Sequence, residues 1–183
     1  MTEAPIFLTG FMGVGKSRIG RLLADRLAWG FLDTDQMVQE RAGMSVAEIF
    51  ARQGEAVFRD LEHDCVREAI QLPEVVVSLG GGAIVQARNR ELVRAAGLLV
   101  CIAADLETIL RRVGRREDRP LLAGLGPAEK RAAVERLLAE RQPFYEQADV
   151  IVHSSDERSP EETTRILWKT IEQWHADHPS RPR

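Results

Sequence analysis

The sequence has few of the features that mark a secreted, membrane-bound or disulfide-stabilised protein. Its two cysteines, Cys65 and Cys101, are far apart and each lies in an apolar run, so we expect buried free thiols and neither a disulfide nor a metal site. The amino terminus has no basic segment followed by a long apolar run, which argues against a signal peptide. No apolar stretch approaches the roughly 20 residues of a membrane span. These absences predict a soluble, cytoplasmic protein that does not contact a membrane.

An excess of charge of one sign is also absent. The 25 basic and 28 acidic residues leave a net charge of −3, without the strongly basic balance typical of nucleic-acid binding. The composition is that of a globular protein, and 183 residues suffice to bury a core in one domain. We predict a single domain over residues 1–175, which acts as a monomer without nucleic acid. Residues 176–183 contain two prolines and few apolar side chains, and are expected to form a disordered tail.

Short apolar runs alternate along the chain with helical patterns. The predicted strands are residues 6–8, 29–32, 75–79, 98–103 and 150–152. Apolar residues recur at helical spacing after Lys16, from a capping box at Ser45 to about Gly54, and over residues 58–70, 106–113, 127–138 and 160–174. Because strands that alternate with helices form parallel sheets, we predict an α/β fold: a five-stranded parallel sheet flanked by helices on both faces.

The segment Gly10-Phe11-Met12-Gly13-Val14-Gly15-Lys16-Ser17 matches the phosphate-loop pattern GxxxxGK[ST], between a predicted strand and a predicted helix. Its glycines let successive backbone N–H groups turn toward one anion, and the helix N-terminus adds partial positive charge. Lys16 should contact the β- and γ-phosphates, and the Ser17 hydroxyl can ligate Mg²⁺. The pattern predicts nucleotide binding, but GTPases, ATPases and small-molecule kinases all use it.

Two aspartates end the second predicted strand, in Asp33-Thr34-Asp35. Ligands of an open parallel sheet bind beyond the carboxyl ends of its strands, so one carboxylate can hold Mg²⁺ through water and the other can accept a hydrogen bond from a substrate hydroxyl. The alternative for Asp35 is a structural role as a helix N-cap. The third predicted strand runs into Gly80-Gly81-Gly82, which lets a ligand approach the backbone, and lacks the aspartate that many phosphate-loop proteins carry there. Asp33 is therefore the available carboxylate for magnesium.

Two further segments have both a structural and a functional interpretation. Arg59 and Glu62 are neighbours on a helix, and most such pairs are surface ion pairs of little energetic value. Residues 114–126 contain five charged side chains, among them Arg119, followed by Pro120 and two further glycines. This segment is either an exposed loop or a mobile lid that carries an arginine.

These motifs follow one another in a recognisable order. They are the phosphate loop, Asp33-Thr34-Asp35, Phe58-Arg59 with Glu62, Gly80-Gly81-Gly82, Arg119-Pro120-Leu121-Leu122, and Arg141 before Pro143 and Tyr145. In order and spacing the set resembles the shikimate kinase family, over about residues 5–170. The resemblance implies a fold like that of the phosphate-loop nucleoside-monophosphate kinases. It also implies transfer of the ATP γ-phosphoryl group to the 3-hydroxyl of shikimate, on the way to chorismate and the aromatic amino acids. The alternative is another small phosphate-loop kinase, acting on gluconate or a nucleoside monophosphate.

The resemblance further implies roles on the acceptor side. Arg59 and Arg141 would grip the shikimate carboxylate, and Glu62 would orient Arg59. The backbone of Gly81 would contact the substrate. Asp35 would bind the shikimate hydroxyls and is the implied acceptor of the attacking hydroxyl's proton.

On the nucleotide side, the resemblance implies that Lys16 and Arg119 act in catalysis, with Arg119 closing over the phosphates. ATP would also contact the loop residues Met12, Gly13, Val14, Gly15 and Ser17. Asp33 would complete the Mg²⁺ site with Ser17. The adenine contact is expected from Arg158, although an alignment shifted by one residue would make it Glu157, and Arg112 is a third candidate.

Overall fold

The computed structural model describes residues 3–114, 120–122 and 124–179. Its centre is a sheet of five parallel strands in the order β2-β3-β1-β4-β5. Their bounds are β1 (Ile6–Thr9), β2 (Gly30–Asp33), β3 (Val75–Ser78), β4 (Leu98–Ala103) and β5 (Val150–His153). All five strands and their parallel arrangement therefore confirm the prediction, with ends that differ by about one residue.

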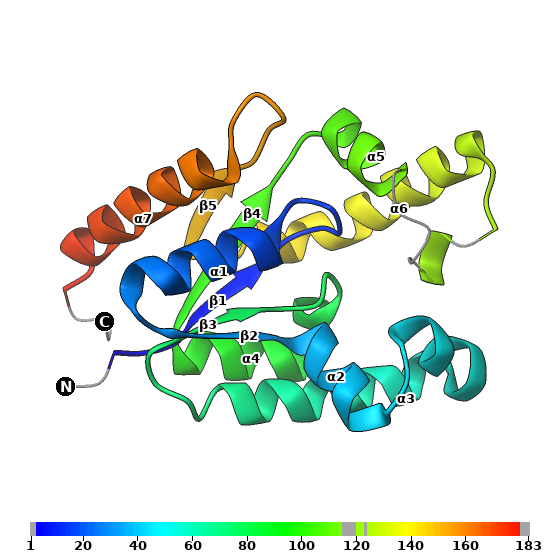
Figure 1. The fold of residues 1–183 in the computed structure, drawn as a ribbon, viewed down its shortest axis with the longest axis horizontal. Coiled ribbons are helices and arrows are strands. Elements are labelled where there is room, and N and C mark those ends of the chain that lie inside the picture. Colours follow the sequence, from blue (N-terminus) through cyan, green and yellow to red (C-terminus); the bar gives the residue numbers. More distant parts are fainter. Residues whose placement is uncertain (1–2, 115–119, 123, 180–183) are drawn as a thin grey trace.

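Helices cover both faces of this sheet, as predicted (Figure 1). Helices α1 and α7 lie on one face, and α4 lies on the other with the carboxyl-terminal half of α3. The helices are α1 (Lys16–Leu27), α2 (Thr34–Ala42), α3 (Val46–Ala69), α4 (Ala87–Ala96), α5 (Leu106–Gly114), α6 (Pro127–Tyr145) and α7 (Pro160–Asp177), with short 3₁₀ turns η1 (Ala83–Val85) and η2 (Pro120–Leu122). In the described parts of the chain, every helix is too short or too polar to cross a membrane.

The burial of the core explains why the sequences of the central strands are continuous apolar runs. Every residue of β1 and β3 is buried, because helices cover both sides of them. A second, smaller cluster joins α2 to α3 through Val38, Ile49, Phe58 and Cys65. Cys65 and Cys101 are both buried free thiols, as expected. The smaller cluster positions α2 and α3 as a unit beside the carboxyl end of β2.

Three local features differ from the predicted elements or refine them. Helix α4 was not predicted, because one of its two buried side chains is Asn89, whose amide donates to the Ala83 carbonyl (3.0 Å) and breaks the apolar periodicity. The predicted break near Gly54 is present as a residue with φ 84° and ψ 170° inside α3. The N-cap of α2 is Asp33 and not Asp35, since Asp33 accepts hydrogen bonds from the backbone of Asp35 and Gln36.

Candidate active site

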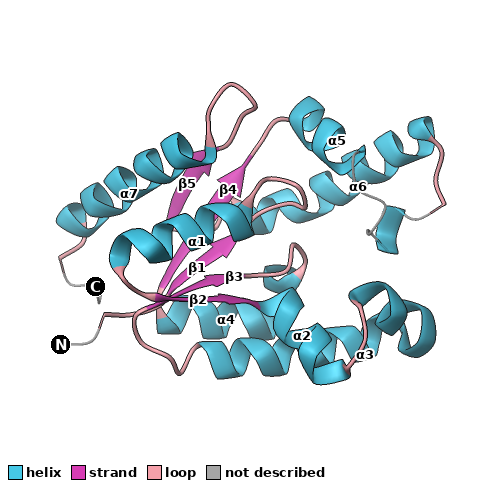
Figure 2. Ribbon diagram, in the orientation of Figure 1, coloured by secondary structure: helices cyan, strands magenta, loops and turns pink. Residues whose placement is uncertain are grey.

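The loops after β1 and β3 meet at one end of the sheet (Figure 2). The first is the phosphate loop, in which Gly10, Gly13 and Gly15 all have positive φ. At Gly10 a Cβ would stand 2.1 Å from the carbonyl oxygen of Ile102, so only glycine fits there. The Lys16 ammonium donates to the carbonyls of Gly10 (2.8 Å) and Phe11 (2.9 Å), which places it within the curve of the loop. The geometry is that of a phosphate-binding loop whose lysine faces the anion position.

Three polar side chains lie just behind the phosphate loop. The Ser17 hydroxyl donates to Asp33 Oδ2 (2.6 Å) and lies 3.3 Å from the hydroxyl of Ser78, which stands at the end of β3. A hydroxyl and a carboxylate are hard oxygen ligands, which suit Mg²⁺. The described residues contain no cluster of three acidic, histidine or cysteine side chains able to hold a metal. This sparse set fits Mg²⁺, which keeps several water ligands when it binds beside a nucleotide.

The three-glycine loop after β3 brings charged side chains close to its backbone. A Cβ on Gly80 would lie 2.5 Å from Glu62 Oε1 and 2.6 Å from Asp35 Oδ1. A Cβ on Gly82 would lie 2.7 Å from Arg59 Nη2. The glycines therefore make room for protein side chains as well as for a ligand. Sequence reasoning missed Thr34, whose buried hydroxyl accepts from the Gly80 N–H (2.9 Å) and ties the start of α2 to this loop.

Arg59 is held by carboxylates on two sides. Its Nη1 donates to Glu62 Oε2 (2.8 Å), while its Nε and Nη2 donate to Glu55 Oε1 (3.2 and 3.0 Å). The Glu62 side chain is only 1% exposed, so this is not the surface ion pair that sequence alone favoured. Burial opposes the charge of Arg59, but Glu62 and Glu55 keep its pKa above the usual value. Glu55 is a further residue that sequence reasoning did not select.

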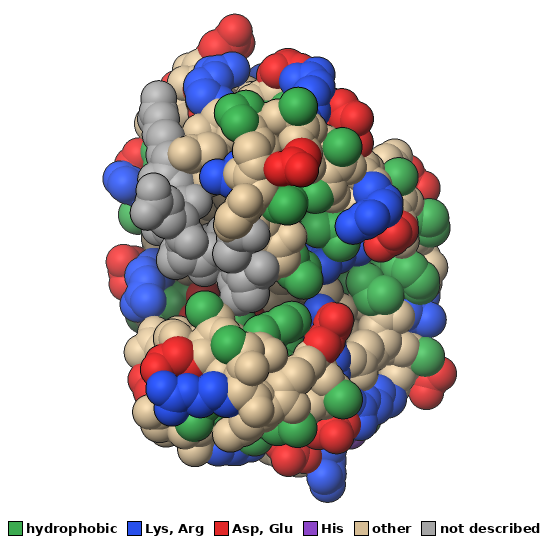
Figure 3. Space-filling view, turned by 90° about the vertical axis from the view of Figure 1, so that its right-hand side faces the viewer, with side chains coloured by type: hydrophobic (Ala, Val, Ile, Leu, Met, Phe, Trp, Pro, Cys, Tyr) green, Lys and Arg blue, Asp and Glu red, His purple; other side chains and the backbone are tan. Residues whose placement is uncertain are grey.

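One pocket brings the predicted acceptor-binding residues together. It is lined by Asp35, Arg59, Gly81 and Arg141, and the phosphate-loop residue Met12 also lines it. The end of the molecule that carries the site is hollowed across its middle in the space-filling view (Figure 3). The site therefore joins two guanidinium groups and two carboxylates, those of Asp35 and Glu62, to the edge of the phosphate loop. That arrangement suits an anionic, hydroxyl-bearing acceptor beside a nucleotide.

The comparisons with known proteins agree with this geometry. The sequence model described as shikimate kinase matches residues 12–172. The chain belongs to the shikimate kinase family. A shikimate kinase of Thermoanaerobacter pseudethanolicus is 42% identical over 151 residues, which are 82% of this chain and 86% of the relative.

Solved shikimate kinase structures share the fold. A structure from Acinetobacter baumannii in complex with shikimate superposes with a TM-score of 0.88 at 32% identity, covering 94% of each chain. A second, from Bacteroides thetaiotaomicron, has a TM-score of 0.86 at 34% identity and covers 92% of this chain and 98% of its own. The chain is accordingly an ATP-dependent kinase with the phosphate-loop nucleoside-monophosphate-kinase-like fold that the motifs implied.

Within this shikimate kinase site, Tyr145 fixes the glycine loop. Its hydroxyl donates to the Gly81 carbonyl (2.6 Å) from the end of α6. Burial raises the pKa of Tyr145 to about 12, although the nearby Arg141 lowers it. The phenol therefore stays protonated at neutral pH and remains a donor. The same helix thus supplies both Arg141, which is predicted to bind the acceptor, and the group that holds the glycine loop.

Glu62 is the most perturbed carboxylate at the site. Burial, and to a lesser degree the charge of Asp35, raise its pKa to about 7 against the opposing effects of Arg59 and Arg141. Among the described residues, its Oε1 has no hydrogen-bond partner. An incompletely solvated carboxylate of this kind is stabilised by protonation. Its ionisation state should therefore change near neutral pH.

We expect Glu62→Gln to remove a pH dependence of stability. Because the folded protein retains this proton above the ordinary glutamate pKa, the wild type should lose free energy of unfolding as pH rises from about 4.5 to about 7. Relative to the variant, the wild type should lose at most roughly 3 kcal/mol of unfolding free energy, because each unit of the pKa difference between the folded and unfolded states is worth 1.36 kcal/mol. Urea denaturation of both proteins between pH 5 and pH 8 measures it. Parallel stability curves would contradict the raised pKa.

The nucleotide side of the site includes two of the three adenine candidates. Arg112 and Arg158 line the same cavity beside Gly13 and Gly15, and Glu157 is not among its lining residues. Arg112 is the more firmly held, because its Nη1 donates to the Ser154 hydroxyl (2.9 Å) and it pairs with Asp156. The Arg158 guanidinium has one long contact, 3.5 Å to the His153 carbonyl. Both arginines remain candidates for the adenine contact.

The predicted lid is only partly described. Arg119, expected to close over the phosphates, lies outside the described residues, as do residues 115–118 and 123. The described part, η2, reaches the acceptor pocket through Leu121. The predicted tail is described as far as residue 179, and α7 continues to Asp177, beyond the end expected near residue 174.

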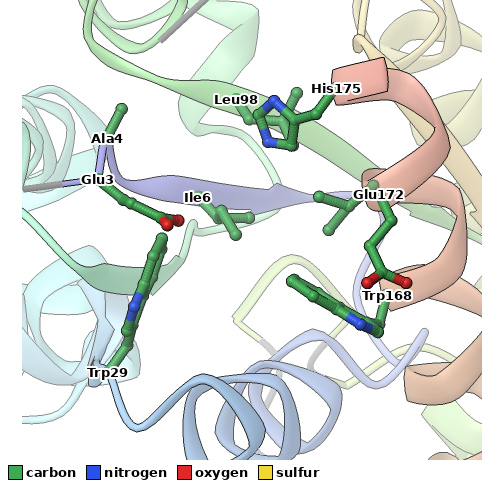
Figure 4. A pocket seen from close by; sticks show the side chains of 9 residues that line it. Glu3, Ala4, Ile6, Trp29, Leu98, Trp168, Glu172 and His175 are labelled. Atoms are coloured by element: carbon green, nitrogen blue, oxygen red, sulfur yellow. The ribbon is translucent and has the colours of Figure 1, made fainter. Parts of the chain in front are cut away.

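A separate cavity of about 260 Å³ lies among Glu3, Trp29, Trp168 and Glu172, at the amino ends of β1 and β4 (Figure 4). Two carboxylates and His175 line it, and among the described residues no lysine or arginine does. An anionic nucleotide or acceptor is bound best by guanidinium or ammonium groups, which this described lining does not offer. Ligands of an open parallel sheet also bind at the opposite, carboxyl ends of the strands. The reaction site is therefore the one beside the phosphate loop.

Proposed function

We propose that this chain transfers the γ-phosphoryl group of ATP to the 3-hydroxyl of shikimate, giving shikimate 3-phosphate and ADP. The observation that carries the proposal is the pocket in which Asp35, Arg59 and Arg141 lie beside the phosphate loop. Shikimate has a carboxylate for the two arginines and hydroxyl groups for the aspartate. The family membership supports the same acceptor.

On the acceptor side, Arg59 and Arg141 bind the carboxylate, because guanidinium groups offer paired donors in a fixed geometry. A Cβ on Gly81 would lie 3.4 Å from both Arg141 Nη1 and the Gly10 carbonyl oxygen of the phosphate loop, and the Gly81 backbone contacts the ring or its substituents. Asp35 accepts a hydrogen bond from the attacking hydroxyl and takes its proton as the new phosphate ester forms. Glu62 keeps the Arg59 guanidinium in place through its 2.8 Å contact.

On the nucleotide side, Met12 to Gly15 wrap the phosphates with backbone N–H groups, and Lys16 stabilises the charge that develops on the transferred group. Ser17 and Asp33 would hold Mg²⁺, which when bound neutralises charge on the β- and γ-phosphates. Arg119 is proposed to add a further positive charge. Residues that bind and stabilise charge thus supply most of the catalysis, as phosphoryl transfer requires.

A coupled assay of ADP release over a panel of acceptors tests the proposal. The panel contains shikimate, gluconate, AMP and CMP, each with ATP and Mg²⁺. We expect turnover with shikimate and with none of the other three acceptors. A chelator that removes the divalent cation should abolish the turnover with shikimate. Turnover with a nucleoside monophosphate and none with shikimate would overturn the proposed function.

A further inference from the structure

Protein groups lie along each of the three hydrogen-bonding edges of the Arg59 guanidinium. Glu62 binds Nη1, and Glu55 binds both Nε and Nη2. The end formed by Nη1 and Nη2 faces Gly82, where a Cβ would stand 2.8 and 2.7 Å from these two nitrogens. The Phe58 ring covers one flat face, with its centre 5.1 Å from Cζ. A substrate carboxylate that pairs with Arg59 must therefore displace one of these neighbours.

Glu55 is the neighbour that can leave most easily. The Glu62 side chain is 1% exposed, so its movement would leave a buried guanidinium without its buried partner. Gly82 belongs to the backbone of a loop that Tyr145 fixes at Gly81. The Glu55 side chain is 57% exposed, and an exposed ion pair contributes about 0.2 to 1 kcal/mol. Its carboxylate can rotate into water at little cost.

The backbone at Glu55 also permits this movement. Glu55 follows Gly54, whose φ of 84° and ψ of 170° interrupt α3. A Cβ on Gly54 would have no atom within 4 Å, and residues 51–53 and 55–57 on either side of it are exposed. By contrast, Arg59 and Glu62 lie within the regular part of α3. The glutamate can therefore change position without moving the guanidinium.

The space on the Glu55 side of Arg59 is suited to a carboxylate. One cavity is lined by Glu55, Arg59 and Arg141 together, and by Gly82 and Leu121, with Glu140 as a second carboxylate on its lining. A carboxylate that replaced Glu55 at the Nε and Nη2 edge would have the second guanidinium on the same cavity. Such a carboxylate would accept hydrogen bonds from the paired donors of Arg59 and would be attracted by the positive charge of Arg141.

From this arrangement we propose that Glu55 is an internal competitor of the substrate carboxylate. It occupies the Nε and Nη2 edge of Arg59 in the free enzyme, and the acceptor's carboxylate takes its place. This inference rests on the proposed function for the identity of the acceptor. It assigns to Glu55 an effect opposite to that of Glu62: Glu62 positions Arg59, whereas Glu55 weakens the binding of every ligand that needs the same edge.

The test is the KM for shikimate of Glu55→Gln, which removes the charge and keeps the length of the side chain. We expect KM to fall by about two- to fivefold, the equivalent of an exposed ion pair, with kcat unchanged. The inhibition constant of cyclohexanecarboxylate, a carboxylate without hydroxyls, should fall by the same factor, because it displaces the same contact. The KM for ATP should not change. An unchanged or higher KM for shikimate would overturn the proposal.

Two further variants separate direct contact from a general effect of charge. Asp64→Asn makes the same change of charge on α3 at an exposed residue that pairs with Arg67, and should leave the KM for shikimate unchanged. Glu55→Asp keeps the charge but shortens the reach to Arg59, and should behave like Glu55→Gln. If Glu55→Asp behaves like the wild type, charge alone acts and the competitor role is wrong. Turnover of the wild-type enzyme with shikimate tests the proposed function. Calorimetric binding of cyclohexanecarboxylate to the variants tests the role of Glu55 separately, because this binding does not require that shikimate be the acceptor.

Discussion

Replacement of Lys16 by alanine is expected to lower kcat by roughly 10²- to 10³-fold, the range found when one group that stabilises transition-state charge is removed. The ammonium lies within hydrogen-bonding distance of two carbonyls of the phosphate loop, at the centre of its curve. No other lysine is near in the sequence, since the remaining two are Lys130 and Lys169. The coupled ADP assay at saturating ATP and shikimate measures the loss.

The fold should survive this substitution. Two hydrogen bonds to loop carbonyls are lost, each contributing about 1 kcal/mol, and the side chain is only partly buried. Lys169→Ala is the matched control, because Lys169 is exposed on α7 and should tolerate the change without loss of activity. Circular dichroism of both variants should show native helix content. A Lys16→Ala enzyme with wild-type turnover would refute the role of the loop.

Asp35→Asn is expected to lower kcat by roughly 10²- to 10⁴-fold, the contribution of a positioned general base. Asp35 Oδ1 lies beside the position that a Cβ on Gly80 would occupy, and Asp35 lines the acceptor pocket with Arg59 and Arg141. The amide keeps the shape of the side chain but accepts protons poorly. Steady-state kinetics with shikimate should show the loss chiefly in kcat.

The stability of this variant separates the two interpretations of Asp35. Because Asp33 is the N-cap of α2, the helix does not need Asp35 as its cap, and the charge of Asp35 in the first turn is typically worth 0.3 to about 1 kcal/mol. Chemical denaturation should therefore show a loss of about 1 kcal/mol or less. A large loss of stability with unchanged turnover would restore the structural interpretation.

The strands and most of the helices could be predicted because their apolar residues recur with the period of the element. Helix α4 could not, since it turns Asn89 toward the core and the pattern shows only Val93 as its second buried residue. The sequence suggested Asp35 as the structural candidate for the N-cap of α2, although Asp33 suits that position equally. Only the backbone geometry, with the Asp35 N–H 3.1 Å from Asp33 Oδ1, distinguishes them.

The phosphate loop could be predicted from its own spacing, whereas the acceptor side depends on packing between distant segments. Arg59 and Glu62 look like an ordinary surface pair until α3 is placed against the glycine loop after β3, which buries Glu62 completely. Glu55 carries no signal in the sequence, because its importance lies in the edge of Arg59 that it occupies. Arg141 and Tyr145 reach the same loop from α6, far along the chain.

Asp33 makes the two halves of the active site energetically dependent on each other. One of its oxygens holds the backbone N–H of Asp35, and the other accepts the hydrogen bond from Ser17. A nucleotide that draws this carboxylate toward itself would also act on the first turn of α2, which carries Asp35, the proposed acceptor of the substrate proton. The affinities for ATP and for the acceptor are therefore expected to be coupled. Thermodynamic linkage makes that coupling equal in both directions, so whichever substrate binds first alters the binding of the second by the same factor.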